Sequence, residues 1–412
     1  MNKTLEPTTW EAELDRAVDA RFEQMVALRR HLHQHPELSG DEDQTSLHLY
    51  RLLLELGFDV QIGPEGRGAI VEPPNAEPGP KLGLRADIDA LKIQDTKTTP
   101  YRSQVPSVMH ACGHDAHTAT LYGALLALFD LQSRNALPWP VRWRGVFQPA
   151  EETGLGALEM IKAGVLQNVQ GMLALHMDPS RDVGQIGIRE GSLTAACDDI
   201  HILISGRGGH AARPHESLDP IVAAAQLIST IYLTVPRVVD THDPVVVTIG
   251  QIQGGYNANV IPEQVEMHGT LRTLNGPIRE KTKDHLQKLA RGLEEVTGTT
   301  IHITFEVGPP AVQNDLALTS LLRHVGRNLL GDACVQEIPR PSMGGEDFAY
   351  YQDYVPGSMF RLGCRSSAAT GHPLHSSLFD IDERALSIGA KIFARAVVTW
   401  FDPQRNQLPY TK

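Results

Sequence analysis

The chain has 412 residues, which is too long for one typical core, so we expect two domains. An apolar fraction of 41% indicates an ordinary globular protein, and a net charge of -12 disfavours nucleic acid or an anionic membrane as partner. Four cysteines make no disulfide scaffold, and neither a signal peptide nor an uninterrupted membrane-spanning apolar run is visible, so we expect a cytoplasmic protein.

The first half of the chain alternates helical and strand patterns. Helices are predicted over 10–33, up to Gly57, over 115–132 and over 154–163, and strands over 68–72, 81–87, 141–148 and 171–176. This alternation is typical of a mostly parallel α/β sheet. Ligands of such sheets bind beyond the carboxyl ends of the strands, so a site is expected where the strands give way to Asp87, Glu151, Glu152 and His176.

The pattern changes after about residue 190. Strands are predicted over 199–205, 244–253, 260–274 and 300–307, with helices over 217–233 and 278–296. The order strand, helix, strand, strand, helix, strand predicts a ferredoxin-like α+β unit. We therefore expect an α/β protein in which a mostly parallel catalytic metal-binding domain (1–190 and 309–412) contains an inserted ferredoxin-like domain (191–308). Helices over 315–330 and 383–400 complete the catalytic domain.

The segment 109–117 holds one thiol, three imidazoles and a carboxylate around a glycine. Thiolate and imidazole are preferred ligands of zinc and other borderline metals, so Cys112 and His114 are candidate ligands. The alternative is a buried thiol beside surface histidines. If Cys112 and His114 stood alone, this alternative would be favoured over a metal site. His110 and His117 are weaker candidates, either as hydrogen-bonding supports or as exposed side chains.

Carboxylates and histidines further along the chain complete the proposed site. Glu151 and Glu152 follow a predicted strand, and because neighbouring side chains diverge, Glu152 is assigned to the metal and Glu151 to proton transfer. The alternative for Glu151 and Glu152 is a solvent-exposed turn without a function in catalysis. The alternative for His176 is a core histidine whose ring nitrogens are hydrogen-bonded within the protein. In the loop 371–377, either His372 or His375 can be a ligand, and spacing does not choose between them.

Further polar residues have supporting or binding roles in this hypothesis. Asp87 is placed to orient a ligating imidazole. The alternative is that it caps a helix or a turn. The glycine-rich loops 206–215 and 254–262 gather cationic and amide groups, and Arg272 lies on the strand that follows. Arginine with an amide side chain suits carboxylate recognition, although the residues alone favour a surface charge for Arg272.

Ten segments, taken together and in order, resemble the amidohydrolase branch of the zinc-dependent aminoacylase and carboxypeptidase superfamily. That branch includes hippurate hydrolases, N-acyl-amino-acid amidohydrolases and plant indole-acetyl-amino-acid hydrolases. The segments are 29–38, 85–91, 109–117, 148–152, 175–176, 208–215, 259–262, 269–272, 343–348 and 374–379. One departure is Lys92, where the family usually has proline.

The resemblance implies two divalent metal ions per subunit, with zinc, manganese, cobalt and nickel all possible. It implies Cys112 as the bridging ligand, completed by His114, Glu152, His176 and His375, and Glu151 as the base for a metal-activated water.

It also implies that the smaller domain is a lid through which a homodimer, or a dimer of dimers, assembles. His210 would stabilise the oxyanion from the neighbouring subunit, and Asn259 and Arg272 would bind the substrate carboxylate.

These observations predict a hydrolase that cleaves small N-acetyl, N-benzoyl or N-arylacetyl amino acids into a carboxylic acid and a free amino acid. A dipeptidase or carboxypeptidase on the same scaffold is an alternative, although no acidic residue is evident for a free amino terminus. A cysteine hydrolase with Cys112 as nucleophile is a third interpretation. A binding protein that has lost turnover is the fourth, and the full set of candidate ligands with Glu151 counts against it.

Overall fold

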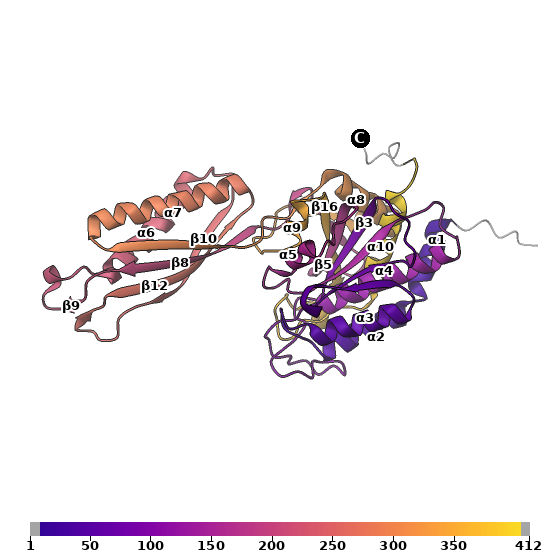
Figure 1. The fold of residues 1–412 in the computed structure, drawn as a ribbon, viewed down its shortest axis with the longest axis horizontal. Helices are drawn as coiled ribbons and strands as arrows, with labels where there is room; N and C mark the ends of the chain where they lie inside the picture. The colour runs from indigo at the N-terminus through magenta and orange to yellow at the C-terminus, as the bar shows by residue number, and fades with distance from the viewer. Residues whose placement is uncertain (1–8, 405–412) are drawn as a thin grey trace, which may run out of the picture. The chain divides into compact units, whose positions relative to one another are not determined.

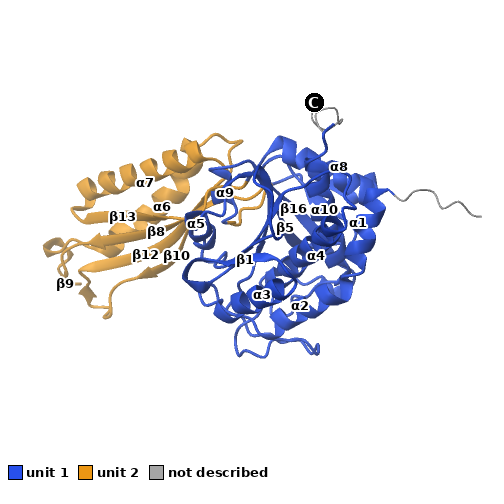
Figure 2. Cartoon of the chain, turned by 45° about the vertical axis from the view of Figure 1, so that its right-hand side comes forward, with its two compact units in different colours: residues 1–191, 313–340, 347–412 blue, residues 192–312, 341–346 orange. Residues whose placement is uncertain are grey.

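The computed structural model describes residues 9–404, which form two compact units (Figure 2). Of these residues, the larger unit contains those up to 191, 313–340 and those from 347 onward. The smaller unit contains 192–312 and 341–346. It therefore reaches past the predicted range of 191–308 and takes in a short segment from much later in the chain.

The larger unit is built around an eight-stranded mixed sheet in the order β1-β2-β4-β3-β5-β16-β6-β15. Its four central strands, β4, β3, β5 and β16, run parallel, and antiparallel pairings lie to either side. This confirms the expected α/β class. The strands are β1 (Asp59–Ile62), β2 (Ala69–Glu72), β3 (Lys81–Asp87), β4 (Trp143–Gln148), β5 (Val169–Asp182), β6 (Ile186–Ile188), β15 (Val335–Glu337) and β16 (Gly357–Arg365).

Helices cover this sheet, and the most deeply buried of them is α4 (His114–Ser133). Alanines and Gly123 on α4 allow close packing, and a Cβ on Gly123 would overlap the sulfur of Met25. A helix buried on nearly every side holds its first turn rigidly, which matters because the candidate site begins there. The other helices are α1 (Trp10–Asp19), α2 (Phe22–Gln34), α3 (Asp43–Glu55), α5 (Gly156–Lys162), α8 (Leu316–Leu330), α9 (Ala349–Gln352) and α10 (Arg384–Trp400).

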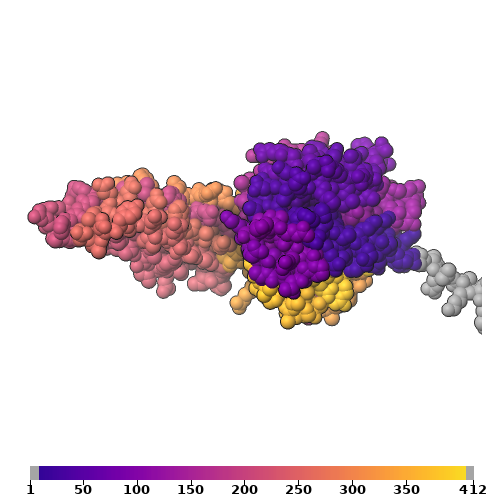
Figure 3. Space-filling model, turned by 90° about the horizontal axis from the view of Figure 1, so that it is seen from below, coloured from indigo at the N-terminus to yellow at the C-terminus, as the bar shows by residue number. Residues whose placement is uncertain are grey.

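The two ends of the described chain meet in the larger unit. Arg395 of α10 pairs with Asp15 of α1 at 2.6 Å, and Lys391 pairs with Asp19 at 2.7 Å. On the surface, the indigo amino-terminal segment therefore lies beside the yellow carboxyl-terminal segment (Figure 3). These ion pairs hold α10 against α1 within the larger unit.

The smaller unit is a four-stranded antiparallel sheet in the order β10-β12-β8-β13. Helices α6 (Pro220–Val238) and α7 (Gly276–Thr297) pack against one of its faces (Figure 1). This is the strand order of a ferredoxin-like unit. The strands are β8 (Ala196–Ser205), β10 (Val245–Gln253), β12 (Gln264–Thr273) and β13 (Thr300–Val307), with shorter strands β9 (Gly209–His210) and β11 (Val260–Ile261). Strand β14 (Gln313–Asn314) belongs to the larger unit, and β7 (Gly191–Ser192) lies where the chain passes from one unit to the other.

Some predicted elements differ from the structure. The helix expected over 10–33 is two helices, with a break at Ala20 and Arg21. The strand expected over 171–176 continues to Asp182, so His176 lies inside β5 rather than at its end. Strands β1 and β16 were not predicted, although β16 is the parallel neighbour of β5.

Among the described residues, α6 is long and apolar enough to cross a membrane, by length and composition only. Its buried residues Ala223, Leu227 and Ile231 pack on the sheet, as in a helix that covers a core. One such helix is weak support for a membrane span, and the cytoplasmic location stays a prediction.

Candidate metal centre

Side chains from several elements of the larger unit converge on Cys112, just before α4. Its sulfur forms one group with His114 and His176 and another with Glu152 and His375, and the candidate ligand atoms within each group lie within 4.8 Å of one another. A third group joins His114 to Glu151 and Glu152. The structure thus brings together the five predicted ligands and the predicted base, from segments that are far apart in the sequence.

Gly113 allows Cys112 and His114 to approach the same point. Its φ of 91° is left-handed, and a Cβ there would lie 3.1 Å from Cγ of Met177. An L-residue would therefore meet both backbone strain and a steric contact. Directly after this turn, Asp115 anchors α4, because its carboxylate accepts hydrogen bonds from Arg29 at 3.0 Å and His33 at 2.8 Å.

The two glutamates are held by a second left-handed turn. Ala150 has a φ of 53°, which is uncommon for a residue other than glycine, and its N–H donates to Glu42 Oε1 at 2.7 Å. The backbone N–H of Glu152 donates to Asp89 Oδ2 at 3.0 Å. With side chains 10% and 15% exposed, Glu151 and Glu152 face the cluster as neighbours, as their proposed division of roles requires.

The imidazoles of His114 and His176 both direct Nε2 toward the cluster. His114 Nδ1 donates to Asp89 Oδ1 at 3.1 Å, and His176 Nδ1 donates to the carbonyl of Met177 at 2.8 Å. His176 Nε2 lies 3.4 Å from Cys112 Sγ. With Nδ1 as the donor in each ring, the Nε2 lone pair is available for a ligand.

Asp87 and Asp89 hydrogen-bond different histidines, and the partner of Asp87 is not a predicted metal ligand. Asp87 accepts from His117 Nδ1 at 2.6 Å, and its other oxygen is 3.8 Å from His114 Nε2. His117 in turn accepts from the N–H of Met177, so Asp87 and His117 tie β3, α4 and β5 together. Asp89 orients the predicted ligand His114, and the Asp-x-Asp spacing after β3 was the available sequence signal for it.

The charges of the cluster favour a cation. Burial lowers the pKa of His114, but the carboxylates of Asp87 and Asp89 outweigh it and hold that pKa well above its usual value. Burial, and next the charge of Glu152, raise the pKa of the Cys112 thiol far above its usual value. A neutral thiol is a poor nucleophile, which disfavours the cysteine hydrolase interpretation.

Two buried atoms test whether a metal suits these residues. His114 Nε2 and Glu152 Oε1 are buried and have no hydrogen-bond partner within residues 9–404, although buried polar atoms are normally paired. They lie 3.8 Å apart, and His375 Nε2 is 3.5 Å from the same Glu152 oxygen. Unpaired nitrogen and oxygen atoms beside a thiol are the donor set of a borderline divalent metal, so the residues fit such an ion.

The remaining predicted site residues belong to the smaller unit. His210 on β9 pairs with Val260 on β11, and the carbonyl of Asn259 accepts from the N–H of Ala211 at 3.0 Å. His210 and Asn259 are thus neighbours on one exposed ribbon. Arg272 lies near the far end of β12, where it donates to the carbonyl of Met343 at 2.8 Å. Eight residues of strand between Gln264 and Arg272 span roughly 27 Å, so Arg272 is remote from that ribbon.

Comparison with known proteins shows which family this chain resembles. The model of peptidase family M20/M25/M40 matches residues 83–399. The chain is 38% identical to an N-acetylcysteine deacetylase of Bacillus subtilis over 375 residues, which cover 91% of this chain and 96% of the relative. It is 35% identical to an Arabidopsis thaliana IAA-amino acid hydrolase over 384 residues, covering 90% of this chain and 84% of the relative.

Among solved structures, a Bacillus subtilis protein described as a dinuclear metal binding peptidase of the M20 family superposes with a TM-score of 0.80. It is 35% identical, and the match covers 93% of this chain and 99% of that one. The match therefore extends over both compact units. On these grounds the chain belongs to peptidase family M20/M25/M40 and is a hydrolase of its amidohydrolase branch.

Proposed function

We propose that this protein is a metal-dependent hydrolase of N-acyl amino acids, which it cleaves into a carboxylic acid and a free amino acid. The observation that carries the proposal is the convergence of Cys112, His114, Glu152, His176 and His375 beside Glu151. The printed names of the bacterial and plant relatives, which refer to N-acetylcysteine and to IAA-amino acids, support this substrate class.

Those five residues would hold two divalent ions, and Cys112 belongs to both of the ligand groups described above. The description of the Bacillus subtilis structure as dinuclear supports this number. When bound, the ions would supply Lewis-acid polarisation of the scissile carbonyl and a lower pKa for the attacking water. Thiolate and imidazole suit zinc, and manganese, cobalt and nickel are the further candidates, so metal reconstitution is the way to identify the native ion.

Glu151 acts as general base in this proposal. Its carboxylate lies 3.9 Å from His114 Nε2 and is mostly shielded from solvent. It accepts a proton from water as the water oxygen bonds to the amide carbon, and it delivers that proton to the leaving nitrogen as the C–N bond breaks. Glu151→Gln should keep its metal and lose roughly 100-fold or more in kcat.

His210 is suited to donate a hydrogen bond to the developing oxyanion. The N–H of Ala212 donates to His210 Nδ1 at 3.1 Å, so in the neutral ring the proton sits on Nε2, at an exposed position. The roughly 27 Å of strand between Arg272 and the ribbon of His210 and Asn259 is too long for one small substrate to span. We therefore propose that one subunit supplies His210 and Asn259 and the other supplies Arg272, within a homodimer formed through the smaller unit.

The test is amino-acid release from N-acetyl, N-benzoyl and N-indoleacetyl amino acids, with free dipeptides and blocked peptides as rival substrates. Protein stripped with a chelator should release amino acid only after zinc, manganese, cobalt or nickel is restored, and Glu151→Gln should stay inactive with normal metal content. Preferential cleavage of free dipeptides or of blocked peptides would instead establish the dipeptidase or carboxypeptidase alternative. Substrate binding without turnover in the metal-loaded protein would establish a binding protein.

A further inference from the structure

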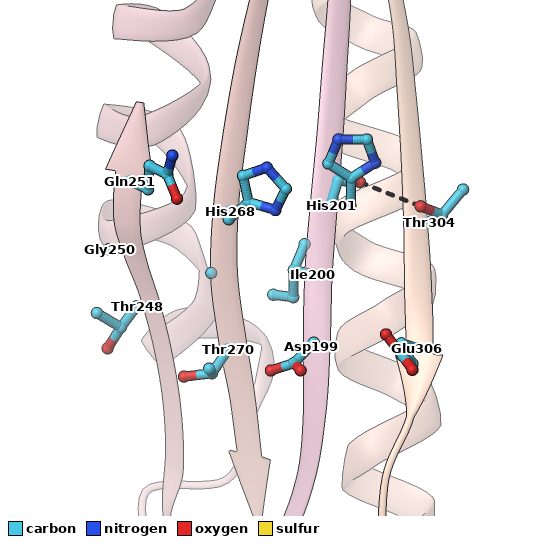
Figure 4. A pocket seen from close by; sticks show the side chains of 11 residues that line it. Asp199, Ile200, His201, Thr248, Gly250, Gln251, His268, Thr270, Thr304 and Glu306 are labelled. Atoms are coloured by element: carbon cyan, nitrogen blue, oxygen red, sulfur yellow. Dashed lines mark hydrogen bonds between the residues drawn. The ribbon is translucent and has the colours of Figure 1, made fainter. Parts of the chain in front are cut away.

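The sheet of the smaller unit has one open face. Alternate residues of its strands, including Ile200, Ile202 and Met267, point into the core formed with α6 and α7. The residues between them point the other way and carry histidine, acidic, threonine and glutamine side chains (Figure 4). This polar face contributes nothing to the core. Of the candidate site residues, Arg272 lies on it, four residues beyond His268 on β12.

Two histidines stand side by side at the centre of this face. His201 of β8 and His268 of β12 are direct cross-strand partners, and their rings stack with centroids 4.6 Å apart and an interplanar angle of 27° (Figure 4). Among residues 9–404, no hydrogen bond involves a ring nitrogen of either histidine; the contact of His201 with Thr304 uses its backbone carbonyl. Both imidazoles therefore present nitrogen atoms that are not committed to a protein partner.

A carboxylate completes a set of three donors. Glu266 lies two residues before His268 on the same face of β12, and one ligand atom from each of Glu266, His268 and His201 falls within a 4.8 Å group. Two imidazoles and one carboxylate form a recurrent protein set for zinc that leaves further positions open. The backbone of β8 and β12 holds both histidines in register, so little ordering is needed on binding.

The surroundings also suit a bound cation. Asp199 and Glu306 lie in the next row of the same face and add negative charge (Figure 4). Beside His268, strand β10 bulges at Gly250, where a Cβ would meet nothing within 4 Å. The resulting hollow leaves room for water or an added ligand to fill the remaining coordination positions.

We propose that His201, His268 and Glu266 form a binding site for one transition-metal ion of the zinc, nickel or copper class, separate from the centre at Cys112. Because β8 and β12 are the two central strands, a bound ion cross-links the middle of the sheet and stabilises the smaller unit. This site is independent of the proposed hydrolysis, since its residues touch none of the candidate catalytic groups.

The experiment is calorimetric titration of the chelator-stripped full-length chain with Zn²⁺, and separately with Ni²⁺. The wild type is compared with the double variant His201→Ala/His268→Ala and with His302→Ala. His302 is an exposed histidine of the neighbouring strand β13 and controls for loss of a surface imidazole. The double variant should bind one ion fewer per chain than the wild type, whereas His302→Ala should bind the same number.

Two further measurements keep the outcome decisive. Glu266→Gln, which retains both imidazoles, should lower the affinity of this site for its ion by at least about tenfold. Excess metal should raise the Tm of the wild type but not that of the double variant. If the double variant fails to fold, His268→Gln at an exposed strand position replaces it. Equal stoichiometry and affinity in the wild type and the histidine variants would overturn the proposal, whether or not amide hydrolysis is observed.

Discussion

Asp89→Asn tests whether the candidate metal centre depends on the carboxylate that orients His114. Asp89 is 1% exposed and accepts three hydrogen bonds, from His114 Nδ1 at 3.1 Å, from the Glu152 N–H at 3.0 Å and from Ser39 Oγ at 2.8 Å. An asparagine keeps one acceptor oxygen and replaces the other with an NH₂ donor. One partner therefore faces a donor, or His114 must move its proton to Nε2, the atom that we expect to bind metal.

Each outcome has a cost that can be worked out. A buried donor left without its acceptor costs about 1–3 kcal/mol of unfolding free energy. Loss of a carboxylate behind a ligating imidazole weakens metal affinity about 10–100-fold, and by the affinity scale this is about 1.4–2.8 kcal/mol.

The assay is metal affinity by competition with a chromophoric chelator, together with denaturant unfolding of the metal-free protein. Asp130→Asn is the matched control, because it makes the same change in a surface pair with Arg134 at 2.8 Å, which contributes at most about 1 kcal/mol. The control should leave metal affinity unchanged. Wild-type metal affinity and stability in Asp89→Asn would refute the role that we assign to Asp89.

Three further predictions follow from the same geometry. Gly113→Ala should lower the free energy of unfolding by about 1–2 kcal/mol and should bind metal more weakly than the wild type. The control is Gly164→Ala: Gly164 has a φ of 83° but open space around a Cβ, so this variant should lose only the backbone contribution to stability. Equal effects of the two variants on metal binding would contradict the role of Gly113. Burial lowers the pKa of His110 from 6.5 to about 4, so the unfolded chain takes up a proton that the folded chain refuses. The contribution of His110 to the stability of the metal-free protein should therefore be complete above pH 6.5 and fall by about 3 kcal/mol toward pH 4, and His110→Leu should remove this part of the pH dependence in denaturant titrations at stepped pH. If His210 acts across a dimer, mixing refolded Glu151→Gln and His210→Ala subunits should recover about one quarter of wild-type activity. Half of the dimers are then mixed, and each mixed dimer has one intact site out of two. No recovery would mean that His210 acts within its own subunit or not at all.

Much of the larger unit could be predicted because its signals are local. Strand β3 and helix α4 show their periodicity in contiguous residues, and the first two candidate ligands, Cys112 and His114, lie within one nine-residue segment, 109–117. Strand β16 was missed because it is buried along almost its whole length and shows no alternation to separate it from loop. The break between α1 and α2 was missed because the apolar stripe continues on both sides of it.

The amino-acid sequence by itself determined which residue types were available: a thiol, imidazoles and carboxylates after strand ends, in an order that resembles one hydrolase family. Only the tertiary structure decided which of them meet. It showed that His375 reaches Glu152, and that Asp89 rather than Asp87 hydrogen-bonds His114. It also showed that Arg272 lies a strand's length from His210. Each of these relations depends on contacts between segments separated by tens to hundreds of residues, and spacing along a chain does not encode such distances.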